Sequence, residues 1–343
     1  MKIVIDAFGG DNAPKEIVLG VVNYLKKNDD VNFVLTGDEE KIKAELKELE
    51  FESDKIEIVH APEIITNDDV PTKAIKEKTN SSLAVAFDIL KKDEDVVGLI
   101  SAGSTGAILA GGFLKIGRIK GVSRPALAPF MPTENGGHVL LIDAGANMDA
   151  NAINLCHFAA MGTEYVKNVL GVENPRVALL SVGTEDHKGN ELVHEVFSML
   201  KKMDINFVGN MEARDLMSGK YDVVVTDGFA GNVALKATEG ALKLMLDEFK
   251  KAFRKNLMTK INALMLKPAL KDMKKTFDFN SYGGALFLGC KKLILKSHGA
   301  AKSETIVSAI DHVKLASQNN IEAEIENAVK DVTIENLCES TEN

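Results

Sequence analysis

The chain has 343 residues, of which 45% are hydrophobic and 27% charged, as in an ordinary globular protein. This length suits one large α/β unit or two tightly joined halves. The net charge of −9 argues against a nucleic-acid-binding protein, because such proteins present a basic surface to the phosphate backbone.

Short apolar runs alternate with amphipathic runs along almost the whole chain. The runs predict strands at 2–6, 32–36, 56–60, 96–101, 138–143, 176–181, 205–209, 222–226 and 293–297. Helical periodicity predicts helices at 14–27, 39–49, 72–91, 105–117, 151–170, 189–202 and 303–317. Strands that are apolar on both faces are typical of buried parallel sheets. We therefore expect a layered α/β fold with a mostly parallel sheet, forming one catalytic unit over residues 1–330.

The first residues, the length of the apolar stretches and the cysteine spacing indicate the cellular compartment of the protein. The chain begins directly with a strand-like run, and no apolar stretch approaches the roughly 20 residues that span a bilayer. Cys156, Cys290 and Cys338 are far apart and lack metal-ligand or disulfide-framework spacing. We expect a cytoplasmic protein without a structural zinc site. Residues 331–343 are acidic and poor in core residues, which suggests a frayed tail.

Glycine-rich loops follow four of the expected strands, at 6–14, 101–107, 181–190 and 226–232. The carboxyl ends of parallel strands are where α/β sheets bind ligands. A Gly/Ser/Thr turn that opens a helix there presents several backbone N–H groups at the positive end of the helix dipole. One such loop is more often a plain strand–helix connection, but four in one sheet favour a site for phosphate. None of them is a Walker A loop or a dinucleotide fingerprint.

Three further ionisable side chains are candidate site residues. Asp143 ends a buried strand, where a carboxylate serves either function or loop capping. Arg124 could pair with phosphate, although a lone charge of this kind is more often a solvated surface residue. His298 ends a strand near the expected site. The sequence has no His/Asp/Glu cluster with metal-ligand spacing and no GxSxG elbow, so we expect no metal and no covalent serine mechanism.

The loops resemble those of the bacterial phosphate acyltransferases, which transfer acyl groups from acyl carrier protein to phosphate. The resemblance rests on residues 4–11, 101–107, 124–128, 143–147, 188–192, 226–233 and 296–299, in the family's order, and extends to about residue 330. Ser104 stands where the family usually has Asn, and Thr184 replaces a common Glu. The resemblance implies a fold related to phosphotransacetylases and isopropylmalate dehydrogenases, a homodimer and no cofactor.

The implied reaction converts acyl-acyl-carrier-protein and inorganic phosphate into acyl phosphate and free carrier protein, the first step of membrane phospholipid synthesis. We expect Lys188 to neutralise the phosphate or the oxyanion, Asn232 to hydrogen-bond the carbonyl oxygen, and Asp227 or His298 to orient groups or protonate the sulfur. The expected phosphate cradle consists of Ser101, Gly103, Ser104, Thr105 and Gly106. Other expected binding residues are Asp6, Gly9, Gly10, Asp11, Arg124, Asp143, Asn147, Gly183, Gly228 and Gly231.

The segment 241–275 is basic and amphipathic. Between Lys243 and Lys275 ten basic residues face three acidic ones, a net charge of +7. Apolar residues recur there at helical spacing, and Pro268 suggests a break between two helices. The segment is either a helix packed on the core or a protruding hairpin that contacts an anionic membrane or an acidic carrier protein. The contact residues would be Arg254, Leu257, Ile261 and Leu264.

Three other functions would fit parts of the same sequence pattern. A short-chain phosphotransacetylase acting on CoA thioesters would share the phosphate site. A non-catalytic, membrane-associated protein that binds a phosphorylated ligand comes from a different class. An NAD-linked dehydrogenase of the related fold would need metal-binding aspartates and a nicotinamide loop, and neither pattern occurs.

Overall fold

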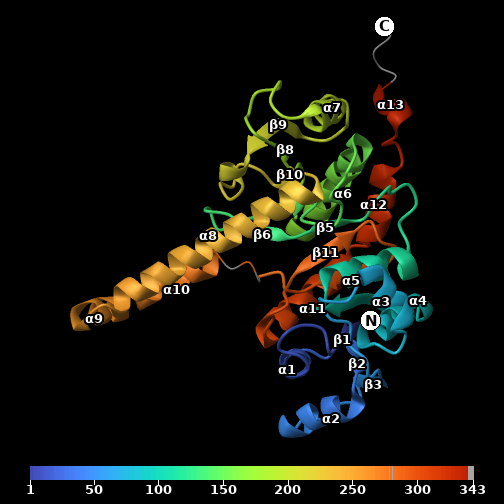
Figure 1. The fold of residues 1–343 in the computed structure, drawn as a ribbon, viewed down its shortest axis with the longest axis vertical. Helices are drawn as coiled ribbons and strands as arrows, with labels where there is room; N and C mark the ends of the chain where they lie inside the picture. The colour runs from blue at the N-terminus through green and yellow to red at the C-terminus, as the bar shows by residue number, and fades with distance from the viewer. Residues whose placement is uncertain (278, 280, 339–343) are drawn as a thin grey trace.

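The computed structural model describes residues 1–277, 279 and 281–338, without the side chains of 274, 275 and 338. Its strands are β1 (Lys2–Asp6), β2 (Asn32–Gly37), β3 (Ile56–His60), β4 (Val96–Ser101), β5 (Ala126–Ala128), β6 (Phe130–Pro132), β7 (His138–Ile142), β8 (Val177–Ser181), β9 (Phe207–Glu212), β10 (Val223–Val225), β11 (Ala285–Leu288) and β12 (Leu293–Lys296). They form two sheets, which lie one above the other in Figure 1.

The first sheet has the order β3-β2-β1-β4-β12-β11-β5, and the second has the order β6-β7-β10-β8-β9. In the first sheet β1, β2, β3, β4 and β12 are parallel, while β11 runs antiparallel between β12 and β5. In the second, only β6 is antiparallel to its neighbour. The predicted layered, mostly parallel α/β fold is confirmed.

Helices cover both sheets. They are α1 (Lys15–Leu25), α2 (Glu39–Glu48), α3 (Pro71–Glu77), α4 (Ser82–Lys92), α5 (Thr105–Gly111), α6 (Ala152–Leu170), α7 (Glu191–Leu200), α8 (Gly228–Arg254), α9 (Leu257–Met265), α10 (Lys267–Thr276), α11 (Ser303–Gln318), α12 (Ile321–Val329) and α13 (Ile334–Cys338). Helices α4 and α11 pack on the first sheet, and α6 and α7 pack on the second.

The two sheets share a hydrophobic core. One cluster joins Ile3 and Ile5 of β1 to Val223 and Val225 of β10, all of them fully or almost fully buried. The alternate residues point the other way, so that Val4 and Val224 belong to a second cluster. Strands that are apolar on both faces therefore fill both sides of each sheet, as their sequences predicted.

The expected frayed tail is wrong for residues 331–338. Val332 and Leu337 are buried in the core cluster that joins the sheets. The Lys202 Nζ donates to the Leu337 carbonyl at 2.8 Å, and the His157 ring lies 2.8 Å from the Val332 carbonyl. Val332, just before α13, and Leu337, within α13, attach this acidic segment to the core. Residues 339–343 lie outside the described part of the chain.

A helical arm projects from the body (Figure 1), as the expected protruding hairpin required. Helix α8 starts at the second sheet and runs outward, α9 lies at the far end, and α10 leads back. The first break falls at Asn256, whose side chain accepts from the Thr259 backbone N–H at 2.9 Å. The predicted break at Pro268 is confirmed. Helix α9 ends at Met265, and Pro268 lies in the first turn of α10, where its missing N–H costs nothing.

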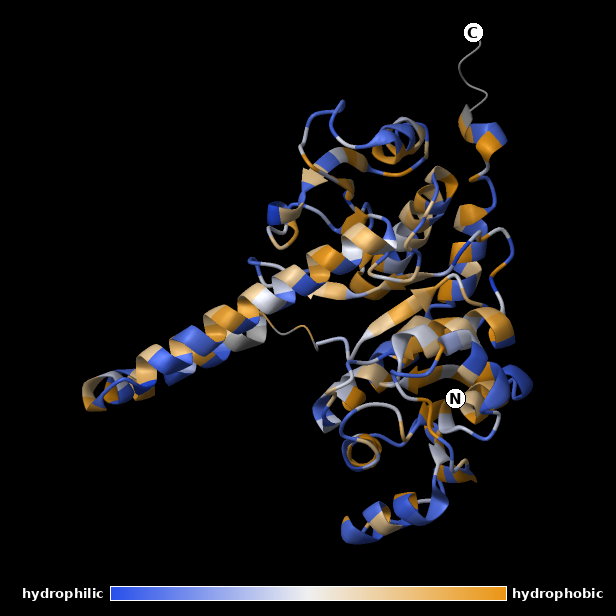
Figure 2. Cartoon of the chain, in the orientation of Figure 1, coloured by the Kyte–Doolittle hydropathy of each residue, from blue (hydrophilic) through white to orange (hydrophobic). Residues whose placement is uncertain are grey.

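The arm exposes apolar side chains along its outer part (Figure 2). Leu257 is 75% exposed and Leu264 is 69% exposed, and α9 buries no residue. The interpretation of this segment as a helix packed on the core is therefore wrong for α9. Among the residues the structure describes, no helix is both long and apolar enough to cross a bilayer.

Candidate active site

Three loops meet at the carboxyl ends of β1, β4 and β12, which are neighbours in the first sheet. The Asp11 backbone N–H donates to the Gly299 carbonyl at 2.8 Å, which ties the first loop to the third. The Ser101 hydroxyl donates to the Asp6 carboxylate at 2.7 Å and accepts from the Gly103 N–H at 3.0 Å. Asp6 and Ser101 thus hold the loops from behind, and burial raises the pKa of the Asp6 carboxyl.

Two glycines let these loops approach each other. A Cβ on Gly9 would lie 2.6 Å from an Asp6 carboxylate oxygen and 2.7 Å from the Gly103 nitrogen. Gly10 has a φ of +96°, and a Cβ there would lie 2.8 Å from the Gly299 carbonyl oxygen. A side chain at either position would force the loops apart.

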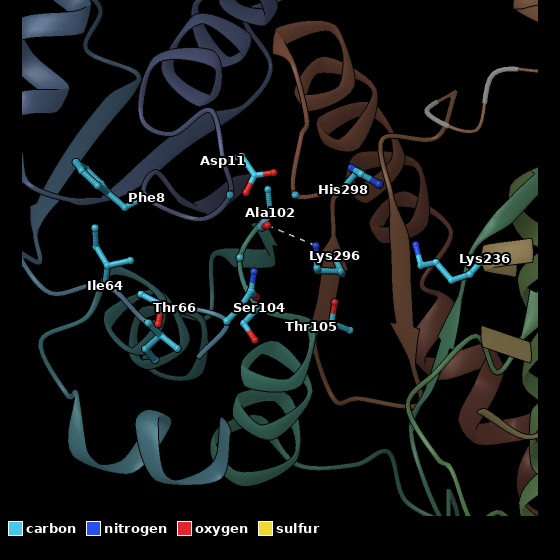
Figure 3. A pocket seen from close by; sticks show the side chains of 15 residues that line it. Phe8, Asp11, Ile64, Thr66, Ala102, Ser104, Thr105, Lys236, Lys296 and His298 are labelled. Atoms are coloured by element: carbon cyan, nitrogen blue, oxygen red, sulfur yellow. Dashed lines mark hydrogen bonds between the residues drawn. The ribbon is translucent and has the colours of Figure 1, made fainter. Parts of the chain in front are cut away.

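The loops enclose a cavity of about 430 Å³ (Figure 3). In Figure 3 Phe8, Ile64 and Thr66 lie on one side, and Lys296, His298 and Lys236 lie on the other. Its lining includes Phe8, Gly10, Asp11, Ile64, Thr66, Ala102, Gly103, Ser104, Thr105, Lys236, Lys296 and His298. Ser104 makes no capping hydrogen bond to α5, so its hydroxyl can serve a ligand.

A second cavity of about 310 Å³ lies between the sheets and is mostly apolar. Leu127, Phe130, Leu235 and Phe279 line it, together with the predicted Asn232. The two cavities share Thr105, Lys236, Lys296 and His298. A polar chamber with cations therefore adjoins an apolar chamber, and the four shared residues mark the junction.

The loops after β7 and β10 build the wall that carries Asn232. The Asp143 carboxylate accepts from the backbone N–H groups of 127, 145, 146 and 147, at 2.7–3.2 Å, and from the Asn147 side chain at 2.9 Å. The Gly228 N–H donates to the Asn147 carbonyl at 2.8 Å, and a Cβ on Gly231 would lie 2.0 Å from the Asp143 carbonyl oxygen. Asp143 and Asn147 thus shape a loop and line neither cavity, which favours loop capping for Asp143.

Several predicted site residues lie elsewhere. Lys188 and Gly183 belong to the loop after β8, where the Lys188 side chain is exposed and lines neither cavity. Arg124 is exposed as well. Gly106 faces Pro71, where a Cβ would meet the proline ring at 2.7 Å. Asp227 caps α8 by accepting from the Ala230 N–H at 2.7 Å. The roles proposed for these residues stay predictions.

Sequence reasoning did not single out Lys296 and Lys236. Lys296 ends β12 after three buried apolar residues, and a lysine at the end of such a strand is the signal that could have identified it. Burial lowers the pKa of its amine to about 8, and the charge of Lys236 acts in the same direction. Lys236 itself pairs with Glu239 at 2.8 Å.

Metal-binding side chains do not gather here. Over the described residues, no group of three or more His, Cys, Asp or Glu side chains could hold a metal ion. The chemistry that these residues offer is the binding of an anion by N–H groups, hydroxyls and ammonium groups beside an apolar space.

The two-sheet α/β fold is similar to that of solved phosphotransacetylases. A phosphotransacetylase from Streptococcus pyogenes superimposes on it with a TM-score of 0.58, covering 96% of this chain and 94% of its own, at 18% sequence identity. That likeness shows the fold alone.

The family follows from sequence comparison. Residues 1–324 match the family described as "Fatty acid synthesis protein". The phosphate acyltransferase of Halothermothrix orenii is 46% identical over 323 residues, which cover 94% of this chain and 96% of that protein. That of Clostridioides difficile is 42% identical over 336 residues, 98% of each chain. The chain belongs to the phosphate acyltransferase family and is an acyltransferase.

Proposed function

We propose that the protein transfers an acyl group from the thioester of acyl carrier protein to inorganic phosphate. The products are acyl phosphate and free carrier protein, and the reaction opens membrane phospholipid synthesis. The observation that carries the proposal is the junction of the two cavities, where a polar, cationic chamber for phosphate adjoins an apolar chamber for an acyl chain.

The chemistry suits such a site. A phosphate oxygen attacks the thioester carbonyl carbon, the new C–O bond forms, and the C–S bond breaks. The proton of hydrogen phosphate ends on the departing sulfur, whose pKa as a thiol is about 8.5. Because phosphate is already an anion near neutral pH, the protein needs to supply mainly positioning and stabilisation of the oxyanion.

We assign the phosphate to the loop of Gly103, Ser104 and Thr105, which lines the polar cavity. Asn232 lines the apolar cavity and would donate to the carbonyl oxygen. His298 lies at the junction and is the better placed of the two candidates for protonating the sulfur, since the Asp227 carboxylate already caps α8. Lys188 keeps its proposed role in neutralising charge, although it lines neither cavity.

The test is to supply the purified protein with inorganic phosphate and either acyl-acyl-carrier-protein or acyl-CoA, and to trap acyl phosphate with hydroxylamine. We expect product from the carrier-protein thioester. Product from short-chain CoA thioesters alone would make the protein a short-chain phosphotransacetylase instead. Lys188→Ala and Asn232→Ala should each lower turnover by about 10²–10³-fold, and wild-type turnover in both would reject the roles assigned to them.

A groove of about 1010 Å³ leads from the junction along α8 towards the arm. It shares Lys236 and His298 with the cavities, and Leu242, Leu246 and Phe277 give it apolar walls. Lys243, Lys250 and Lys302 line it as well, together with Glu239, Asp247 and Glu304. The apolar walls support passage of an acyl chain along the arm towards the junction.

We also propose that the arm contacts an anionic membrane. The supporting observation is the exposed apolar side of α9, with Leu257, Ile261 and Leu264, next to basic residues such as Arg254. Each basic residue near an anionic leaflet contributes on the order of 1 kcal/mol.

Serine substitutions at 257, 261 and 264 should abolish flotation with phosphatidylglycerol vesicles and leave turnover with soluble substrate unchanged. Val208→Ser, at an exposed apolar position outside the arm, is the matched control. Lost turnover with unchanged flotation would assign the arm to the carrier protein.

We also propose that the protein forms a homodimer, as the family resemblance implies. Phe229 is 66% exposed and Val233 is 53% exposed on the first turns of α8, so an apolar surface lies beside Asn232. Sedimentation analysis should give twice the 37.1 kDa mass of the chain. A monomer at micromolar concentration would contradict this.

A further inference from the structure

Lys296 stands at the junction of the two cavities. It is the last residue of β12, and its neighbour in the sheet is Ser101, the last residue of β4. Its side chain lines both the polar and the apolar cavity. In Figure 3 the amine reaches from the strand end towards Ala102, between Asp11, Ser104 and His298.

Among the described residues, the Lys296 amine has carbonyl partners but no carboxylate at ion-pair distance. It donates to the Ala102 carbonyl at 3.4 Å and to the Ser297 carbonyl. Within the described residues, no carboxylate lies within the 4.0 Å of an ion pair, whereas Lys236 has Glu239 at 2.8 Å. Holding an ammonium group away from water costs free energy unless an anion compensates.

The other charged groups around the Lys296 amine shift its pKa in opposite directions. Asp11 lies in the same cavity and Asp6 lies behind the loops, and both favour the charged amine. Lys236, which also lines both cavities, disfavours it. Burial is the largest influence and lowers the pKa of the amine to about 8, so that the amine is mostly protonated near neutral pH. An anion bound at the junction would raise the pKa of the Lys296 amine and offset the free-energy cost of burying its charge.

We propose that Lys296 binds the inorganic phosphate, as a direct ligand of the anion at the junction of the cavities. The inference rests on the proposed function for the identity of the anion. The ammonium donates to a phosphate oxygen, while the loop of Gly103–Thr105 holds the anion from the other side. The phosphate is thereby held where the apolar cavity begins, within reach of a thioester carbonyl. A phosphate group carried by the acyl donor would have the same chemistry, and the kinetics distinguish the two sources.

The first experiment is calorimetric titration of inorganic phosphate into the wild-type protein and into Lys296→Met, Lys296→Arg and Lys292→Met. Lys292 is the matched control, because it directly precedes β12 and also donates to two backbone carbonyls, those of Glu94 and Val96. We expect Lys296→Met to weaken phosphate binding by about 10- to 100-fold, the loss of one charge-assisted hydrogen bond. Lys296→Arg should recover part of the affinity, and Lys292→Met should bind as the wild type does.

Steady-state kinetics identify the source of the phosphate group. In Lys296→Met the KM for inorganic phosphate should rise at least tenfold while the KM for the acyl donor stays within about twofold. A rise confined to the acyl donor would assign Lys296 to a phosphate on that donor and overturn the proposal. Wild-type affinity for inorganic phosphate in Lys296→Met would overturn it as well.

A second measurement uses the unmutated protein, in case Lys296→Met does not fold. Trace labelling of lysines with acetic anhydride, read by mass spectrometry, should show that inorganic phosphate protects Lys296 and leaves Lys292 unaffected. Equal labelling with and without phosphate would refute the proposal. Because binding and labelling need no turnover, absence of acyl phosphate formation would reject the proposed function while these two results still decide the role of Lys296.

Discussion

Substituting Gly9 with alanine tests how closely the loops after β1 and β4 must approach. The added Cβ would lie 2.6 Å from an Asp6 carboxylate oxygen, 2.7 Å from the Gly103 nitrogen and 2.8 Å from the Ser101 hydroxyl. Ordinary contact begins at 3.4 Å, so the two loops must separate by about 0.7 Å at the Gly103 nitrogen. Neither polar side chain can swing aside, because the Ser101 hydroxyl and the Asp6 carboxylate are hydrogen-bonded to each other.

This displacement falls on the expected phosphate loop. A misplacement of about 1 Å costs on the order of 10²-fold in rate, so kcat/KM for phosphate should fall by roughly that factor. Overpacking should also lower the free energy of unfolding by about 1–3 kcal/mol. The measurements are acyl phosphate formation at varied phosphate concentration and urea denaturation at the same pH.

Gly240→Ala is the matched control for this prediction. Gly240 lies within α8, and a Cβ there would have no atom within 4 Å. It should leave turnover unchanged and raise the free energy of unfolding by about 1 kcal/mol, because alanine favours the helix. If Gly9→Ala kept wild-type kcat/KM, the close approach of the loops would have no part in catalysis.

Two further predictions concern stability. Asp143→Ala leaves five hydrogen-bond donors without their acceptor. The free energy of unfolding, measured by urea denaturation, should therefore fall by about 3–5 kcal/mol. A loss below about 1 kcal/mol would contradict the loop-capping role. Burial lowers the pKa of His312 to about 4 from 6.5, so its neutral form stabilises the fold above pH 6.5. That stabilisation, about 3 kcal/mol, should disappear as the pH falls from 6.5 to 4, and His312→Gln should flatten this slope of unfolding free energy against pH.

Much of the fold could be predicted from periodicity because its strands are apolar on both faces. Nine strands were expected, and the structure has a strand in each place. The omitted strands β5, β6 and β11 have three or four residues and no β-branched one, whereas the equally short β10 and β12, which were predicted, contain Val or Ile. The single helix expected over 72–91 is two helices, because Ser81 accepts from the Ala84 N–H and begins α4.

The candidate site was predicted in part because it is built from loops with glycines and small polar residues at strand ends. The loops of residues 6–14 and 101–107 do meet, since β1 and β4 are neighbours in the sheet. Lys296 was not assigned from the sequence although it ends a predicted strand, because its place in the site depends on β12 lying beside β4, two strands separated by almost 200 residues. Lys188 follows β8, which lies beyond β10 in the second sheet; the segment after β10 lines the apolar cavity, and the loop after β8 does not.

The central claim is that an inorganic oxyanion is bound where the loops after β1, β4 and β12 meet. A crystal soaked with inorganic phosphate tests it most directly. We expect density for phosphate in the polar cavity, within hydrogen-bond distance of the Ser104 hydroxyl, the Thr105 backbone N–H and the Lys296 amine. An empty cavity at saturating phosphate, or phosphate bound only outside it, would contradict the account.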